Sequence, residues 1–339
     1  MRYQHLFKLS LILFTLSLLL AACSGVANNT GSSNGNSGNS GESGAFKVAI
    51  LLPGPIDDTG WSQTGYDGLK YIEKELGAQI AYTASVPGEQ AKQEEILRQY
   101  AKDGYNFILA HGGEYTPALE VVAKEFPQTR FAIITGYGGN NKNLGGLAVR
   151  SDEDGFLAGA VAGLKTTSNK VAYIGGQQFP STEEEAAAFE LGVKHVNPAA
   201  EVSIAWVDSW SDQEKAKEIA LTQIEAGVDV LAVDAAFAGL AVLTLAEEKG
   251  IHAIGWIQDQ HELAPKAVVV SALQQMNILM LEGAKLVQQG RWEGKQYKMG
   301  LQEDVVDLSP LYGDWTPEQK ETIKQVKEDI ISGKIDALP

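Results

Sequence analysis

Cysteine is nearly absent from this chain, which has 339 residues and a single cysteine, Cys23. One cysteine excludes an intrachain disulfide and a thiolate metal cluster. The five histidines are scattered, and His261 begins no zinc-binding helix because Pro265 stands where a second histidine would be needed. The sequence therefore predicts neither a metal site nor a cofactor.

Basic patches and enzyme motifs are also missing. Lys and Arg number 27 against 43 Asp and Glu, so nucleic acid is not an expected partner. No Walker loop occurs, the glycine-rich residues 136–139 lack a dinucleotide-binding glycine at Asn141, and residues 60–64 lack the second glycine of a nucleophile elbow. His111 and Glu114 are a histidine–acid pair at a predicted loop, and such a lone pair is more often structural than catalytic. We therefore expect a protein that binds and is not an enzyme.

Long hydrophobic runs are absent except near the start of the chain. Residues 9–20 follow Arg2 and Lys8 and are almost entirely apolar, but the run is too short to span a bilayer comfortably. It ends in the sequence LAAC, which is typical of cleavage by lipoprotein signal peptidase. We expect residues 1–22 to be a signal peptide and Cys23 to carry a lipid anchor on the extracytoplasmic face of the cell membrane. An ordinary signal peptide with an incidental cysteine is the alternative.

A flexible tether is predicted to follow the anchor. Residues 23–44 are almost entirely Gly, Ser and Asn, which cannot bury a core. A chain of this kind reaches about 25 Å by the flexible-linker relation. This layout suits a surface receptor, although a tethered enzyme would have the same one.

Apolar runs of the first half of the body recur in the second half. Three pairs are offset by 123 residues and a fourth is two residues short of that offset. The pairs are residues 47–52 and 170–174, 81–84 and 204–207, 104–109 and 227–232, and 131–134 and 252–255. Helical patterns separate the runs, so the chain is read as βαβαβαβ twice.

This alternation predicts the α/β class, with two doubly wound parallel-sheet lobes around a ligand cleft. Open parallel sheets bind ligands beyond the carboxyl ends of their strands. The binding residues should therefore lie in the loops that follow the strands. We expect these to be Asp58, Trp61, Ser62, Gln63, Gly112, Glu114, Tyr115, Trp210, Asp234 and Asp259.

Two tryptophans give the strongest indication of a ligand class. Trp61 follows the first predicted strand and Trp210 follows the second strand of the second lobe. Either could simply cover a hydrophobic surface, but two in loops that should face each other favour stacking on a flat ligand. Ser62, Gln63 and Asp58 could read the edge of a ring, while Asp58 could equally cap the following helix. Asp234 and Asp259, at strand ends of the second lobe, could likewise either bind the ligand or have a structural role.

The motifs of the chain resemble those of the basic membrane protein family, also called Med-like, of ABC-transporter substrate-binding lipoproteins. The similarity covers residues 46–309. It includes GPIDDTGWS at 54–62, DGFLAG at 154–159 and DSWSD at 208–212. The resemblance implies the type I periplasmic-binding-protein fold, and Trp61 and Trp210 stand where members have stacking phenylalanines. The best-known members of this family are purine nucleoside receptors.

The departures from the family concern the ligand. Nucleoside-binding members have an Asp where this chain has Ile257 and a Lys where it has Gln274, and both would hold ribose hydroxyls. Ser62 replaces an Asn that reads the base, and Thr116 replaces an Asp. The resemblance therefore favours a free nucleobase or similar heterocycle over a nucleoside.

The resemblance also implies three crossings between lobes, near Arg150, Lys266 and Leu301. Lobe one would comprise residues 45–150 and 267–300, and lobe two residues 151–266 and 301–339. Residues 268–289 would return to lobe one, and a helix at 317–331 would pack on lobe two.

The expected function is that of a monomeric, lipid-anchored solute-binding protein that passes a small ligand to an ABC permease. A sensory or regulatory binding protein of the same fold is the second hypothesis. A tethered nucleoside hydrolase is the third, and it would need a catalytic acid or metal cluster that the sequence does not display.

Overall fold

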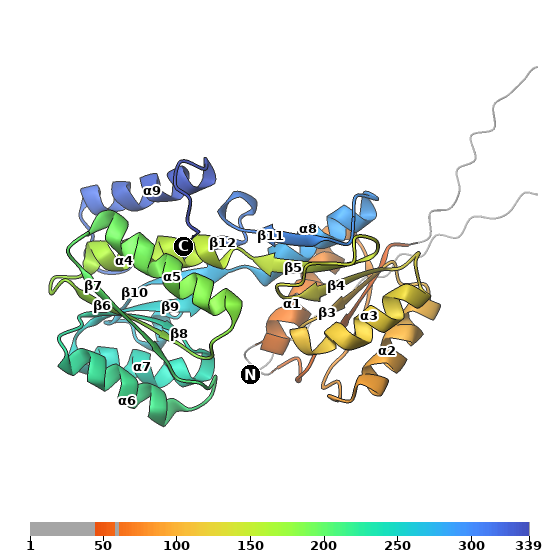
Figure 1. Cartoon of the computed structure of the whole chain (residues 1–339), viewed down its shortest axis with the longest axis horizontal. Coiled ribbons are helices and arrows are strands. Elements are labelled where there is room, and N and C mark those ends of the chain that lie inside the picture. The colour runs from red at the N-terminus through yellow and green to blue at the C-terminus, as the bar shows by residue number, and fades with distance from the viewer. Residues whose placement is uncertain (1–44, 58–60, 339) are drawn as a thin grey trace, which may run out of the picture. The chain divides into compact units, whose positions relative to one another are not determined.

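Two six-stranded sheets with helices on both faces make up the body of the protein (Figure 1). The computed structural model describes residues 45–57 and 61–338, which together form one compact unit. The expected signal peptide, the tether, Cys23 and Asp58 lie outside the described residues. Within the described residues, no helix has both the length and the apolar character needed to cross a membrane.

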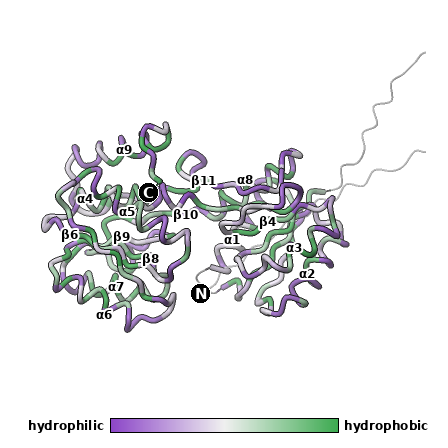
Figure 2. The backbone as a smooth tube through the Cα atoms, viewed as in Figure 1, coloured by the Kyte–Doolittle hydropathy of each residue, from purple (hydrophilic) through white to green (hydrophobic). Residues whose placement is uncertain are grey.

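The first sheet is entirely parallel and has the strand order β11-β5-β4-β3-β1-β2. Its strands are β1 (Lys47–Leu51), β2 (Gln79–Thr83), β3 (Phe107–Ala110), β4 (Arg130–Ile134), β5 (Leu144–Val149) and β11 (Gln296–Met299). The central strands β1, β3 and β4 are continuous apolar runs because helices cover both of their faces. Figure 2 shows the hydrophobic residues concentrated along such strands.

Helices on the two faces of this sheet enclose two hydrophobic clusters. The helices are α1 (Trp61–Leu76), α2 (Gln90–Lys102), α3 (Thr116–Glu125) and α8 (Met276–Gln288). Leu69 of α1 and Met280 of α8 belong to one cluster, and Leu97 of α2 and Leu119 of α3 belong to the other. We call this sheet with its four helices lobe one.

The second sheet has the order β12-β10-β9-β8-β6-β7, in which only β12 is antiparallel. Its strands are β6 (Lys170–Gly175), β7 (Glu201–Trp206), β8 (Val230–Asp234), β9 (His252–Ile257), β10 (Val268–Gln274) and β12 (Val306–Leu308). Its helices are α4 (Ser151–Lys165), α5 (Pro180–Val196), α6 (Gln213–Glu225), α7 (Ala236–Lys249) and α9 (Pro317–Ile331). Residues of α4, α5 and α9 share a hydrophobic cluster with this sheet, and α6 and α7 contribute to a second cluster. We call this part lobe two.

Glycines explain why α4 and α5 pack so closely in lobe two. A Cβ atom at Gly159 of α4 would lie 2.0 Å from the carbonyl oxygen of Phe189 in α5. In the opposite direction, a Cβ atom at Gly192 would lie 2.0 Å from the carbonyl oxygen of Phe156. The DGFLAG motif is therefore a helix-packing motif whose glycines allow direct contact between the two backbones.

The two lobes repeat one plan at the level of the backbone. Ser85 after β2 and Asp208 after β7 are 123 residues apart, and both have positive φ, 52° and 57°. Gly104 and Gly227 share the same separation, with φ of 77° and 95°. Matching strand order and matching unusual dihedrals support the duplicated plan read from the apolar runs.

One expected lobe boundary is wrong. Residues 268–274 were expected in lobe one, but they form β10, which pairs with β9 and β12 in the second sheet. The chain enters lobe one only after Gln274, where α8 begins at Met276. The apolar β10 is buried between two strands of its own sheet, which is why it completes lobe two before the chain crosses. The other two passages lie at Arg150, between β5 and α4, and at Gly300, directly after β11.

Candidate ligand-binding site

Backbone strain gathers at the carboxyl ends of the strands. Four of the described non-glycine residues with positive φ follow or end strands here: Ser85, Asp208, Ala236 and Ile257. Ile257 is the most unusual, because a β-branched residue at φ 67° is a steric outlier. Such strain is retained at functional sites when the surrounding structure imposes it. The edge predicted from strand polarity is therefore marked by its backbone as well.

Trp61 is the first residue of α1 and presents an exposed indole at this edge of lobe one. Trp61 is 41% exposed. The indole stacks on the imidazole of His111, with ring centroids 3.9 Å apart and an interplanar angle of 18°. Its Nε1 donates a hydrogen bond to the His111 carbonyl oxygen at 3.0 Å. The ring is thus held in one orientation while much of the residue stays in solvent.

Ser62 and Gln63 follow Trp61 on the first turn of α1. Ser62 is buried, and its Oγ accepts a hydrogen bond from the Gly54 N–H at 2.8 Å. This bond fixes the loop between β1 and α1, so Ser62 has a clear structural role. Gln63 is half-buried beside it.

The residues after β3 form a tight turn. Gly112 has φ 144°, and a Cβ atom there would lie 2.2 Å from Oε2 of Glu114. Only glycine lets the exposed Glu114 carboxylate fold over the turn in this way. Tyr115 is fully buried in the lobe-one core, and its hydroxyl has no hydrogen-bond partner. Burial raises the pKa of this hydroxyl, and the side chain does not reach the surface.

Trp210 is the corresponding aromatic residue of lobe two and follows β7. A Cβ atom at Gly176 would lie 2.1 Å from Cε3 of Trp210, so the indole rests directly on the glycine backbone. The Trp210 carbonyl oxygen accepts a hydrogen bond from Ala238 N–H at 3.0 Å. Gly176 N–H in turn donates to the Asp234 carbonyl oxygen at 2.7 Å. Trp210 and Asp234 are therefore connected through one glycine.

Asp234, the last residue of β8, belongs to a buried group of polar side chains. The Tyr173 hydroxyl lies 2.7 Å from Glu185 Oε1 and 3.3 Å from Asp234 Oδ2. The Gln274 amide donates to Asp154 Oδ2 at 2.8 Å and to Glu185 Oε2 at 3.3 Å. We call Asp154, Glu185 and Asp234 the carboxyl cluster.

Burial raises the pKa of each member of the carboxyl cluster. The pKa of Asp154 rises to about 8 and that of Asp234 to about 6, in both cases chiefly through loss of hydration. The pKa of Glu185 lies well above its ordinary value, first through burial and then through the negative charges of Asp234 and Asp154. At neutral pH the cluster therefore retains protons.

Asp259 is exposed in the loop after β9 and organises that loop. Its Oδ2 accepts a hydrogen bond from the Tyr312 hydroxyl at 2.5 Å, and its Oδ1 accepts one from His261 N–H at 3.1 Å. The rings of Tyr312 and His261 stack with centroids 3.6 Å apart.

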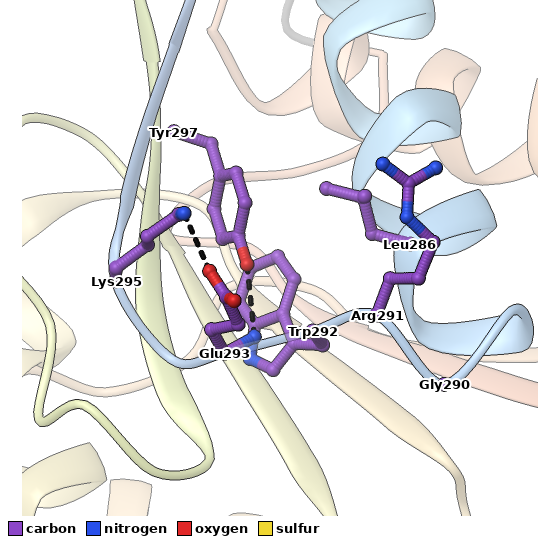
Figure 3. A pocket seen from close by; sticks show the side chains of 7 residues that line it. All are labelled: Leu286, Gly290, Arg291, Trp292, Glu293, Lys295 and Tyr297. Carbon is purple, nitrogen blue, oxygen red and sulfur yellow. Dashed lines mark hydrogen bonds and ion pairs between the residues drawn. The ribbon is translucent and has the colours of Figure 1, made fainter.

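Of two cavities among the described residues, one lies away from the expected site residues and the other is bordered by Tyr312, the hydrogen-bond partner of Asp259. One of about 320 Å³ is lined by residues from the segment 286–295 and by Tyr297 of β11, and the rings of Trp292 and Tyr297 stack there at 4.8 Å (Figure 3). Another of about 330 Å³ is bordered by His252, Lys165 and Lys266. In the part of the chain that the structure describes, no group of acidic, histidine or cysteine residues could hold a metal ion.

Apart from Asp234, the members of this group were not among the expected site residues. Glu185 stands in a run of three glutamates, which is typical of a solvated helix face, and Tyr173 lies within an apolar strand. Asp154 opens the DGFLAG motif, but only its packing against α5 shows that it is buried. The sequence signal was therefore limited to the presence of acidic residues near a helix start.

Two similar parallel-sheet lobes, each with a tryptophan at its carboxyl edge, define the class of two-lobed solute-binding proteins. Residues 45–337 match the family model Bmp, described as ABC transporter substrate-binding protein PnrA-like. The chain belongs to this family of substrate-binding proteins, which is not an enzyme family, and the resemblance stated from the motifs is confirmed.

Individual relatives agree with this assignment. A purine-binding protein of Brucella abortus is 26% identical over 290 residues, which cover 85% of this chain and 82% of that protein. The transcriptional activator protein Med of Bacillus subtilis is 27% identical over 271 residues, covering 78% and 83%. The crystal structure of a transcriptional activator of the comK gene from Bacillus halodurans has a TM-score of 0.75 at 24% identity, covering 86% of this chain and 99% of that one. These similarities confirm the periplasmic-binding-protein fold.

Proposed function

We propose that this protein is the lipid-anchored, extracytoplasmic receptor of an ABC importer and that it binds a planar, nucleobase-like ligand between its lobes. The observation that carries the ligand class is the pair of supported tryptophans. His111 supports one face of Trp61, and Gly176 supports one face of Trp210. A rigid aromatic surface loses little conformational entropy when it stacks on a flat ligand.

Closure of the two lobes on the ligand would complete the site. The chain passes between the sheets at Arg150, Gln275 and Gly300, and short passages of this kind suit hinge motion. The closed lobes would then present the surface that the permease recognises. The family assignment supports this mechanism, because its members are substrate-binding proteins of ABC transporters.

A free base is favoured over a nucleoside by the two positions that would grip ribose. Ile257 offers no polar side chain there. The Gln274 amide is already engaged with Asp154 and Glu185. The purine-binding relative from Brucella abortus supports the purine class as the first ligands to test.

The decisive experiment is calorimetric titration of the purified protein with adenine, guanine, hypoxanthine, xanthine, uracil, their nucleosides and simple sugars. We expect a base to bind tightly and its nucleoside more weakly. Tighter binding of the nucleoside would refute the argument from Ile257 and Gln274 while leaving a transport receptor. Binding of sugars alone would refute the ligand class.

A regulatory function is the second candidate, because the relative from Bacillus subtilis is named a transcriptional activator. Whether Cys23 carries a lipid distinguishes the transport receptor from the regulatory protein. Growth with radiolabelled fatty acid should label the wild-type protein, and Cys23→Ser should abolish the label and release the protein from the membrane fraction. An unlabelled, cytoplasmic wild-type protein would favour regulation.

A further inference from the structure

Basic side chains mark the amino edge of the lobe-one sheet. All strands of this sheet are parallel, so their first residues meet at one edge. Each strand has a lysine or arginine at its first residue or shortly before it: Lys47 for β1, Lys74 for β2, Lys102 for β3, Arg130 for β4, Lys142 for β5 and Lys295 for β11. Neighbouring strands lie about 4.8 Å apart, so these residues form a row roughly 24 Å long. We call these six residues, together with Arg291, the basic edge.

The opposite edge of the same sheet carries the opposite charge. The residues that directly follow β1, β2, β3 and β4 are 52–60, 84–89, 111–115 and 135–140. They contain Asp57, Asp58, Glu89 and Glu114 but no lysine or arginine. Ligand binding is expected at this carboxyl edge. Charge is therefore separated along lobe one, although acidic residues outnumber basic ones by 43 to 27 in the whole chain.

Lobe two does not repeat this charge pattern. At the offset of 123 residues, Lys102 corresponds to Glu225, and Lys124 in the last turn of α3 corresponds to Glu247. The edge strand β7 begins at Glu201. A lysine at a helix C-terminus favours the helix dipole in either lobe, but the glutamates show that the duplicated fold does not require lysine at these positions. The basic edge is a property of lobe one alone.

The side chains of the basic edge are available to a partner. Lys102, Lys142 and Arg291 are exposed, and within residues 45–57 and 61–338 none of the three forms an ion pair. The Arg291 guanidinium donates through Nη1 to the neutral Gln289 Oε1 at 3.1 Å. These three charges are therefore not neutralised by acids of the same molecule.

One of the two cavities opens at this edge. The cavity of about 320 Å³ has the stacked rings of Trp292 and Tyr297 in its wall. Figure 3 shows Arg291 and Lys295 on opposite sides of these rings. Lys295 is ion-paired with the exposed Glu293, which leaves the Arg291 guanidinium as the uncompensated charge of the cavity. The cavity offers both space and a cation to a small anionic group such as a phosphate.

The polypeptide enters the body at this same edge. β1 begins at Lys47 in the middle of the sheet, so the predicted tether of residues 23–44 joins the body there. A tether with a reach of about 25 Å would keep this edge within range of the membrane that holds an anchor at Cys23. Anionic headgroups attract lysine and arginine side chains that come within a Debye length, about 10 Å at moderate ionic strength.

We propose that the basic edge of lobe one is a docking surface for the anionic phospholipid headgroups of the membrane that holds the anchor. This inference rests on the lipid anchor of the proposed function and goes beyond it. Headgroup phosphates pair with Lys102, Lys142 and Arg291, and one headgroup occupies the cavity beside Arg291. The carboxyl edge then stands farther from the headgroups by the length of a five-residue strand, roughly 16 Å, and remains open to ligand.

The test measures how close each edge of lobe one lies to the membrane in the lipid-anchored protein. Cys23 is the only cysteine and would carry the lipid, so an introduced cysteine is the one free thiol for a fluorescent label. Gln128→Cys labels the amino edge and Gly88→Cys labels the carboxyl edge, and both positions are exposed. Quenching by a headgroup-attached quencher is compared between vesicles of mixed phosphatidylglycerol and phosphatidylcholine and vesicles of phosphatidylcholine alone.

Charge reversal tests the basic edge directly. The triple variant combines Lys102→Glu, Lys142→Glu and Arg291→Glu. Its control makes the same change in net charge at exposed lysines of lobe two, with Lys217→Glu, Lys249→Glu and Lys320→Glu. Thermal unfolding checks that both triple variants are folded, and Lys142→Glu alone replaces the first if it is not.

We expect the label at position 128 to be quenched at least about threefold more in the anionic vesicles than in the neutral ones, and the label at position 88 to show no such excess. About 1 M salt should abolish the excess, because the Debye length falls to about 3 Å. Reversal at the basic edge should abolish it too, whereas the control should keep most of it. Equal quenching at position 128 in both kinds of vesicle, or equal loss in both triple variants, would refute the docking surface while preserving the receptor function. A wild-type protein that carries no lipid and does not enter vesicles would refute the anchor of the proposed function itself.

Discussion

The two lobes place different chemistry on equivalent positions of one fold. His111 in lobe one and Asp234 in lobe two are 123 residues apart, the offset of the repeated strands, and both are buried at the ends of matching strands. Ser62 and Glu185 have the same separation and are also buried. In lobe one these positions orient Trp61 and its loop, whereas in lobe two both carboxyl groups accept the Tyr173 hydroxyl in a buried cluster. Duplication preserved the backbone while the polar side chains diverged.

The difference indicates a division of labour between the lobes. At its edge, lobe one has neutral polar side chains in structural contacts, such as the Ser62–Gly54 hydrogen bond, while the Tyr115 hydroxyl in its core is unpartnered. Lobe two has strained and incompletely paired groups, including Ile257 and Asp154. Unsatisfied buried groups and strained backbones are concentrated where binding occurs. We therefore expect lobe two to decide which ligand is selected and lobe one to supply a rigid stacking surface.

The largest expected effect concerns the packing that is special to lobe two. Gly159→Ala would place a methyl group 2.0 Å from the Phe189 carbonyl oxygen, so α4 and α5 must separate. We expect a loss of about 3 kcal/mol in the free energy of unfolding, the upper range for overpacking. Urea denaturation measures this loss. Gly88→Ala in lobe one, where the added Cβ meets nothing within 4 Å, is the control; equal effects of both variants would contradict the packing argument.

The next effect tests the stacking surface of each lobe. Trp61→Ala and Trp210→Ala should each weaken binding of a planar base by about 2 kcal/mol, the typical value for base–aromatic stacking. The melting temperature of the ligand-free Trp61 variant should change little, because the residue is 41% exposed. Calorimetry and thermal unfolding check both statements, and Trp61→Phe should retain most of the affinity. A large loss of stability without a loss of affinity would identify Trp61 as a core residue.

A smaller effect concerns the pH dependence that the carboxyl cluster gives to lobe two. The pKa values of Asp154 and Asp234 are raised to about 8 and about 6, so the folded state keeps protons that the unfolded state releases near pH 4. The stabilisation is full below about pH 4 and is lost as pH rises toward 8, by about 1.4 kcal/mol per pH unit for each extra bound proton. Urea unfolding between pH 5 and 8 should show a steeper decline for the wild type than for Glu185→Gln. Parallel curves would show that Glu185 holds no proton in the folded state.

The smallest effect tests the strain that the two lobes share. Ser85→Gly and Asp208→Gly relieve positive φ at equivalent positions, and each should change stability by no more than about 0.5 kcal/mol, because glycine also increases the entropy of the unfolded chain. Chemical denaturation of both variants provides the comparison. Opposite signs at the two positions would show that side-chain contacts outweigh the shared backbone geometry there.

The sequence was informative where the physics is local. Continuous apolar runs predicted the central strands β1, β3, β6, β8 and β9, because a strand buried on both faces must be apolar throughout. The strands β5, β11 and β12 were not predicted. They contain glycine or polar residues, or only three residues in all, and they form only because neighbouring strands are present to pair with them. The predicted crossing between lobes near Lys266 is wrong for the same reason. The lobe to which β10 belongs is decided by the strands with which it pairs, β9 and β12.

The sequence by itself determined the repeated α/β plan, and it predicted the strand edge at which binding residues are expected, with Trp61 and Trp210 among them. These follow from hydrophobic periodicity and from strand polarity, both of which are properties of short segments. Only the tertiary structure placed Asp154, Glu185 and Asp234 in one buried group. Glutamates look solvated in sequence, and the close approach of α4 and α5 through Gly159 and Gly192 removes water from that region. Desolvation is a property of the assembled fold, and it raises the pKa of otherwise ordinary acids.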